Sequence, residues 1–166
     1  MVNGEFSRCA DEGVHHILVS EQRAPASVGA PDKEEHMGQD LDSVTKFHDQ
    51  FAESWAKGDG KILGDHFVED ASLINPFGER ADGRAAIAAM YGAYFDGMLT
   101  GTSTTIRVEN VRALGESQAF VDAEQTILAI DDSIVLVVHL AGLIRRDGED
   151  WKFVDARPYA FAPIPS

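Results

Sequence analysis

"WAKGDGKILGDHFVEDASLINPFGERADGRAAI", residues 55–87, sets the order of the first structural elements in this 166-residue chain. Its glycines, its proline and most of its charges stand between short apolar segments rather than inside them. Gly and Pro are typical of turns, because Gly adopts positive φ freely and Pro has a fixed φ and no backbone N–H. The stretch therefore predicts short elements joined by turns at residues 58–59, 75–78 and 83–84, and we expect these turns to hold open the mouth of a pocket.

Helices are predicted on both sides of the first turn. Apolar side chains recur every three or four residues from Leu41 to Trp55, which is one face of a helix over about 41–57. Asp59 is a suitable N-cap for a short second helix, which we expect to end near Glu69.

A strand and a third helix complete the stretch. The apolar run 71–75 stops abruptly at Pro76, which predicts a buried strand that runs into a turn. The third helix is expected after Gly83, with apolar and aromatic side chains at helical spacing from Ile87 to Met98.

After Gly101 the pattern changes to that of a β-sheet. Four segments rich in Val, Ile, Thr and Phe are separated by short turns, at about 103–113, 117–130, 134–146 and 151–161. Such short links require antiparallel neighbours, and strands of ten or more residues must twist and curl. We expect an α+β fold in which three N-terminal helices cover part of the concave face of a curved, mostly antiparallel sheet.

Composition restricts the possible partners. A net charge of −14, from 28 acidic and 14 basic residues, argues against a nucleic-acid partner, which needs a basic surface. No run approaches the roughly 18 to 20 apolar residues of a membrane span, and the single cysteine, Cys9, excludes a disulfide framework. We expect a cytoplasmic protein with no membrane partner.

The chain divides into a tail and one domain. Residues 1–40 have scattered Pro and Gly and no sustained periodicity, so they are predicted to be a disordered N-terminal tail. Residues 41–166 form the predicted domain, which is long enough to bury a substantial core.

Five short motifs in order resemble a known family. The chain over residues 41–162 resembles the nuclear transport factor 2-like superfamily, in its SnoaL-like branch and within that the SgcJ/EcaC-type proteins. The motifs are WAKGDG (55–60), HFVEDA (66–71), INPFG (74–78), GRAAI (83–87) and DGEDWKF (147–153).

The resemblance implies a cone-shaped half barrel that encloses a deep apolar pocket, and a homodimer formed through the outer face of the sheet. It also implies acid-base chemistry in secondary metabolism, such as antibiotic biosynthesis, on a polyketide-type, polycyclic or other apolar intermediate. The reaction would be a cyclisation, an isomerisation or a dehydration. The sequence has no phosphate-binding glycine loop, no dinucleotide fingerprint and no His pair at ligand spacing, so we expect neither a cofactor nor a metal.

The sequence differs from the families that it resembles at their catalytic positions. Ketosteroid isomerases have an aspartate base before the proline, where this chain has Asn75, and their oxyanion-hole residues fall at Phe51 and Gly142. SnoaL-type cyclases and related epoxide hydrolases carry an R-D-Y motif on a late strand, where this chain has Pro158 between Arg157 and Tyr159.

Three residues remain as candidate catalytic groups. Asp155 and Arg157 share a face of the last strand if alternation is strict, and Arg157 is suited to hold an enolate or a carboxylate. His139 interrupts an apolar strand, and histidine is a common general acid or base in catalysis. Each also has a structural interpretation, as a salt bridge or as a core or interface histidine.

Seven residues are candidate ligand contacts on the helices and turns: Phe51, Trp55, His66, Asn75, Phe77, Tyr91 and Tyr94. Their aromatic rings favour a flat apolar ligand, and buried tyrosine hydroxyls need a hydrogen-bond partner. Two hypotheses stay open besides an enzyme. The first is a non-catalytic binding or accessory protein, and the second is a dimerisation module whose cavity is filled.

Overall fold

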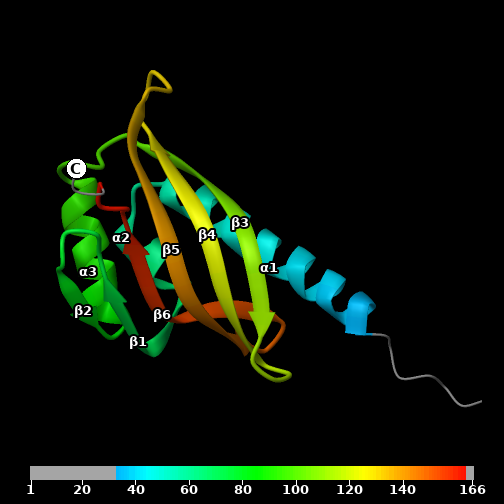
Figure 1. Cartoon of the computed structure of the whole chain (residues 1–166). Coiled ribbons are helices and arrows are strands. Elements are labelled where there is room, and N and C mark those ends of the chain that lie inside the picture. Colours follow the sequence, from blue (N-terminus) through cyan, green and yellow to red (C-terminus); the bar gives the residue numbers. More distant parts are fainter. Residues whose placement is uncertain (1–32, 164–166) are drawn as a thin grey trace, which may run out of the picture. The chain divides into compact units, whose positions relative to one another are not determined.

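The computed structural model describes residues 33–163, and the tail predicted for residues 1–40 lies largely outside them. In chain order the elements are α1 (Lys33–Trp55), α2 (Gly60–Gly64), β1 (Phe67–Ile74), β2 (Arg80–Asp82), α3 (Arg84–Phe95), β3 (Ser103–Ala113), β4 (Gln118–Leu128), β5 (Ile134–Asp147) and β6 (Asp150–Tyr159) (Figure 1).

The six strands form one open sheet in the order β2-β1-β6-β5-β4-β3. All neighbours are antiparallel except β1 and β6, which are parallel. Helix α1 packs against β3 and β6, and α3 packs against β1, β2 and α2. Figure 1 shows α1 running behind the long strands β3, β4 and β5. The predicted α+β fold, three helices on a mostly antiparallel sheet, is confirmed.

Register shifts account for the bending of the long strands. Each shift places one or more extra residues in one strand of a pair, which increases the local twist and bends the strand. They occur in four of the five pairings, between Phe67 and Ser72, Val108 and Asn110, Ile127 and Leu128, and Leu143 and Ile144.

Element boundaries differ from the predicted ones near the N-terminus. Helix α1 begins at Lys33, eight residues before the predicted start. Helix α2 ends at Gly64 rather than near Glu69, because the chain from Phe67 onward pairs with β6 as strand β1. Strand β2 was not predicted, because a strand of three residues is too short to show an alternating pattern.

A close approach of two backbones fixes α3 on α2. A Cβ atom added at Gly60 would lie 2.2 Å from the Ala88 carbonyl oxygen and 2.4 Å from the Gly92 nitrogen. Only glycine at position 60 allows this contact. Asp59 caps α2 as predicted, because its Oδ1 accepts from the Lys61 nitrogen at 2.8 Å. Helix α3 also forms one wall of a cavity, so the contact between α2 and α3 sets the position of that wall.

No helix among residues 33–163 is long and apolar enough to cross a membrane.

Candidate functional site

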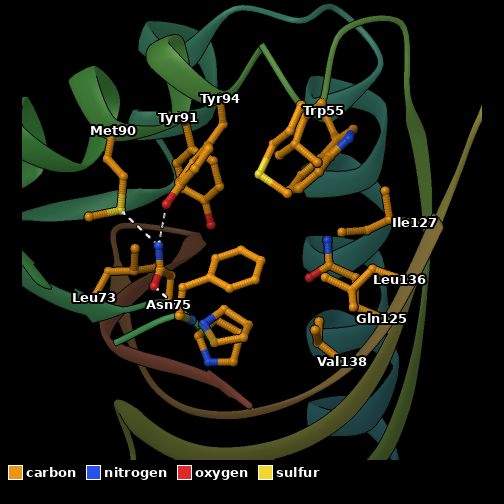
Figure 2. A pocket seen from close by; sticks show the side chains of 15 residues that line it. Trp55, Leu73, Asn75, Met90, Tyr91, Tyr94, Gln125, Ile127, Leu136 and Val138 are labelled. Atoms are coloured by element: carbon orange, nitrogen blue, oxygen red, sulfur yellow. Dashed lines mark hydrogen bonds between the residues drawn. The ribbon is translucent and has the colours of Figure 1, made fainter. Parts of the chain in front are cut away.

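A cavity of about 60 Å³ lies between α3 and the inner face of the sheet (Figure 2), and we call it the α3 cavity. Side chains from α1, α3, β1, β4, β5 and β6 and from the turns after β1 and α3 surround it. They are Trp55, Leu73, Asn75, Pro76, Phe77, Met90, Tyr91, Tyr94, Met98, Leu99, Gln125, Ile127, Leu136, Val138 and Pro158. None of these side chains carries a formal charge.

Five of the seven predicted ligand contacts line this cavity: Trp55, Asn75, Phe77, Tyr91 and Tyr94. Phe51 lines a smaller, deeper cavity of about 20 Å³, which shares four lining residues with the α3 cavity: Leu73, Tyr91, Gln125 and Pro158. His66 lines neither. The turn at residues 75–78 therefore contributes to the cavity wall, whereas the turns at 58–59 and 83–84 only position the helices.

Asn75 organises the turn and the cavity wall together. Its Oδ1 accepts from the backbone nitrogens of Phe77 at 3.0 Å and Glu79 at 2.9 Å. These two bonds fix the orientation of the Asn75 amide, with Nδ2 on the side opposite to the backbone nitrogens. Nδ2 donates to the Tyr94 hydroxyl at 2.6 Å and to Glu79 Oε2 at 2.9 Å. The Tyr94 hydroxyl in turn donates to Glu79 Oε2. Asn75, Glu79 and Tyr94 thus form a closed network at the edge of the cavity.

Tyr91 presents a hydroxyl without a partner. No hydrogen bond joins this hydroxyl to any residue in the described part of the chain, and Figure 2 shows it pointing into the hollow. Burial raises the pKa of the Tyr91 phenol because it disfavours the phenolate. The group is therefore neutral at physiological pH and is available both as a donor and as an acceptor.

The mouth of the cavity is apolar and partly open. Phe77 is 61% exposed and Met98 is 52% exposed. The wall behind them is rigid by comparison, because the buried Trp55 donates from Nε1 to Thr102 Oγ1 at 3.0 Å, and Thr102 donates to the Leu99 carbonyl at 2.8 Å.

The three predicted catalytic residues lie on the other face of the sheet. Asp155 and Arg157 do share a face of β6, but the cavity-lining Pro158 and the buried Ala156 occupy the opposite one. Arg157 forms an ion pair with Asp155 and donates to the Ser72 carbonyl at 3.1 Å. The structure therefore brings these two together, but away from the α3 cavity.

His139 lies on the same outer face. Its ring centroid is 4.3 Å from that of Phe161 and 5.7 Å from that of Tyr159. Its neighbours on β5, Val138 and Leu140, are buried on the inner face. A catalytic role for His139 in the α3 cavity would require access through the sheet.

His66 and His48 belong to the aromatic core below the cavity. His66 Nε2 lies 2.8 Å from Ser54 Oγ, and its ring meets Phe47 and Phe51 edge to face. His48 is fully buried. Its Nδ1 donates to the Val44 carbonyl at 2.8 Å, which leaves Nε2 as the unprotonated nitrogen of the neutral ring. Nε2 has no hydrogen-bond partner among residues 33–163.

Both histidines are expected to make the fold acid-sensitive. Burial is the main cause that lowers the pKa of His48 and of His66 below the ordinary value of 6.5. The unfolded chain then binds more protons, so stability from these groups is complete above about pH 6.5 and decreases as the pH falls below it. Between pH 6.5 and 5 the free energy of unfolding by urea should therefore decrease. We expect this decrease to be smaller in His48→Leu than in the wild type. An unchanged slope in this variant would rule out His48 as its cause.

The sequence patterns did not predict two residues of the candidate site. Glu79 follows the turn at 75–78, and a turn of this length brings residue 79 back to Asn75. Gln125 is 8% exposed and alternates with the outward-facing Glu124 and Thr126, so the same alternation marks it as a polar residue on the buried face.

The described part of the chain contains no group of three His, Cys, Asp or Glu side chains arranged to hold a metal ion.

The comparisons with known proteins agree with this geometry. A sequence profile described as the SnoaL-like domain matches residues 44–156. No curated protein matched the chain in sequence.

Solved structures share the fold at low identity. A Nostoc punctiforme domain of unknown function with a cystatin-like fold is 21% identical, with a TM-score of 0.67 over 76% of this chain and 80% of that one. An NTF2-like protein from Novosphingobium aromaticivorans is 19% identical, with a TM-score of 0.65 over 79% and 91%. A provisionally named scytalone dehydratase from the same organism is 15% identical, with a TM-score of 0.63 over 75% and 86%.

Proposed function

This chain belongs to the SnoaL-like domain family, and from that premise we propose that it binds a small, mainly apolar molecule in the α3 cavity and transforms it by acid-base chemistry. The reaction would move a proton within the ligand, as in a cyclisation, an isomerisation or a dehydration. The structurally similar protein named as a scytalone dehydratase supports this class of chemistry.

The observation that carries the proposal is the network of Asn75, Glu79 and Tyr94. The phenol of Tyr94 lines the cavity, while the Glu79 carboxylate to which it donates is exposed to solvent. A ligand C–H proton can pass to the Tyr94 oxygen as the Tyr94 hydroxyl proton passes to Glu79 Oε2. The return of both protons delivers one to a different ligand atom, so the network ends in its starting state.

Deuterium exchange into 2-tetralone tests this proposal. This neutral, flat ketone has acidic C–H groups next to its carbonyl, and NMR in D₂O follows their exchange. We expect the protein to accelerate the exchange. Glu79→Gln should reduce the protein-catalysed rate about a hundredfold, because general acid-base catalysis contributes factors of this order.

Glu69→Gln is the matched control, since Glu69 is an exposed glutamate on β1 that does not line the cavity. It should keep the wild-type rate. Exchange at the buffer rate in the wild-type protein, or equal rates in wild type and Glu79→Gln, would contradict acid-base catalysis by this network.

A second candidate function is non-catalytic binding or delivery of a ligand to a biosynthetic enzyme. It is favoured by the absence of any charged side chain among the residues that line the α3 cavity. Binding of 2-tetralone without accelerated exchange would select this candidate.

The finer assignments rest on the sequence alone. We infer an SgcJ/EcaC-type protein of secondary metabolism, with a polyketide-type ligand, from the five motifs in the sequence. We also infer a cytoplasmic location and a homodimer through the outer face of the sheet. In support of the dimer, that face exposes Val135, Val137 and Tyr159, and Phe161 follows β6.

A further inference from the structure

We propose that Gln125 determines ligand specificity in the α3 cavity, by selecting a neutral ring compound that carries a hydrogen-bond donor such as a phenolic or enolic hydroxyl. The donor would bond to Gln125 Oε1. This inference rests on the proposed function, because it assumes that the α3 cavity is the binding site.

The orientation of the Gln125 amide follows from its neighbours. Gln125 Nε2 donates to Thr104 Oγ1 at 3.1 Å. The Thr104 hydroxyl spends its single proton on the Thr126 carbonyl at 3.0 Å, so toward Gln125 it can only accept. If the amide were flipped, Gln125 Oε1 would face Thr104 Oγ1, and two acceptors would oppose each other. The NH₂ group must therefore face Thr104, and Oε1 is left on the cavity side.

Gln125 Oε1 is an acceptor with no donor. The residue is 8% exposed, it lines the cavity, and no side chain or backbone group among residues 33–163 donates to its oxygen. Because Gln125 Oε1 faces the cavity, an apolar ligand would cover it and leave it without a partner, so a ligand that donates to it gains more than an apolar ligand of equal shape. Gln125 therefore favours ligands with an O–H or N–H group at this depth.

Tyr91 complements Gln125 from the opposite wall. Figure 2 shows the Tyr91 hydroxyl and the Gln125 amide on opposite sides of the hollow. A hydroxyl can donate to Gln125 Oε1 and still accept from Tyr91, since each hydroxyl oxygen has two lone pairs. A bare ketone or ether can use only Tyr91.

Charge and size restrict the ligand further. No Lys, Arg or His lines the cavity, so a carboxylate would lose its hydration and meet the acceptor Gln125 without a cation to pair with. The cavity of about 60 Å³ is smaller than the 150 Å³ apolar cavity that is known to bind benzene. A ring must therefore extend into the mouth between Phe77 and Met98, with its donor leading.

Phenol, toluene and benzoate are the probes that test this inference, because they share one ring and differ in the leading group. The indole N–H signals in ¹⁵N NMR spectra report binding. Trp55 lines the cavity, whereas Trp151 donates to Ser43 Oγ outside it and serves as the internal control. We expect phenol to bind about tenfold more tightly than toluene through the Trp55 signal, and benzoate not to bind.

Gln125→Met keeps the length of the side chain and removes the acceptor. It should bring the affinity for phenol down to that for toluene, while Gln118→Met, the same change on the outer face of β4, should leave the preference intact. Equal affinities for phenol and toluene in the wild type, or tightest binding of benzoate, would overturn the inference but not the proposed function. No Trp55 shift with any probe would contradict both.

Discussion

Gly60→Ala is expected to destabilise the protein by about 3 kcal/mol or more, because the added methyl group has no space. Its Cβ would lie 2.2 Å from the Ala88 carbonyl oxygen and 2.8 Å from the Gly92 Cα, and both are backbone atoms. Backbone atoms in a packed helix cannot rotate away as a side chain can. Helix α3 must therefore move away from α2, which also displaces Tyr91 and Tyr94 in the cavity wall.

Gly92→Ala is the matched control on the opposing helix. A Cβ at Gly92 meets no atom within 4 Å, and alanine favours a helix interior over glycine by up to about 1 kcal/mol. This variant should be neutral or more stable. Urea unfolding measures both, and a loss below about 1 kcal/mol in Gly60→Ala would contradict the close approach of α2 and α3.

Phe153→Ala is expected to cost about 3 to 5 kcal/mol, the usual range for removing a buried phenylalanine ring. Phe153 is 2% exposed. Its ring centroid lies 5.0 Å from that of Phe47, 5.2 Å from that of Phe67 and 5.7 Å from that of Phe51. The ring thus connects α1 to the parallel pair β1 and β6, and it forms part of the floor of the deeper cavity.

Phe77→Ala is expected to affect ligand binding at the cavity mouth but not the stability of the fold. Because Phe77 is 61% exposed, its removal should change the unfolding free energy by no more than about 0.5 kcal/mol. It should still weaken the binding of 2-tetralone, since the ring lies at the mouth. A similar loss of stability in Phe77→Ala and Phe153→Ala would contradict this division between mouth and core.

The long antiparallel strands were predictable because their signals are local. Val, Ile and Thr recur through the segment 103–113, which matches β3, and turn residues delimit the strand predicted at 134–146. The start of β1 at Phe67 was not predictable in this way. Its partner is the parallel strand β6, more than eighty residues later in the chain, and no local pattern announces such a pairing.

Residue type indicated which aromatic side chains line the α3 cavity, but not which face of a strand points toward it. Aromatic side chains on α1 and α3 were expected to line a pocket, and Trp55, Tyr91 and Tyr94 do line the α3 cavity. Alternation correctly placed Asp155 and Arg157 on one face of β6. Alternation does not say which face the helices cover, because that depends on packing with distant elements.

A single assay on variants of both faces of the sheet tests whether the active site lies in the α3 cavity. Deuterium exchange into 2-tetralone is measured for Tyr94→Phe in the α3 cavity and for Asp155→Asn and His139→Gln on the outer face. We expect Tyr94→Phe to lose the protein-catalysed exchange and both outer-face variants to keep it. Retained exchange in Tyr94→Phe together with its loss in the outer-face variants would contradict the placement of the active site in the α3 cavity.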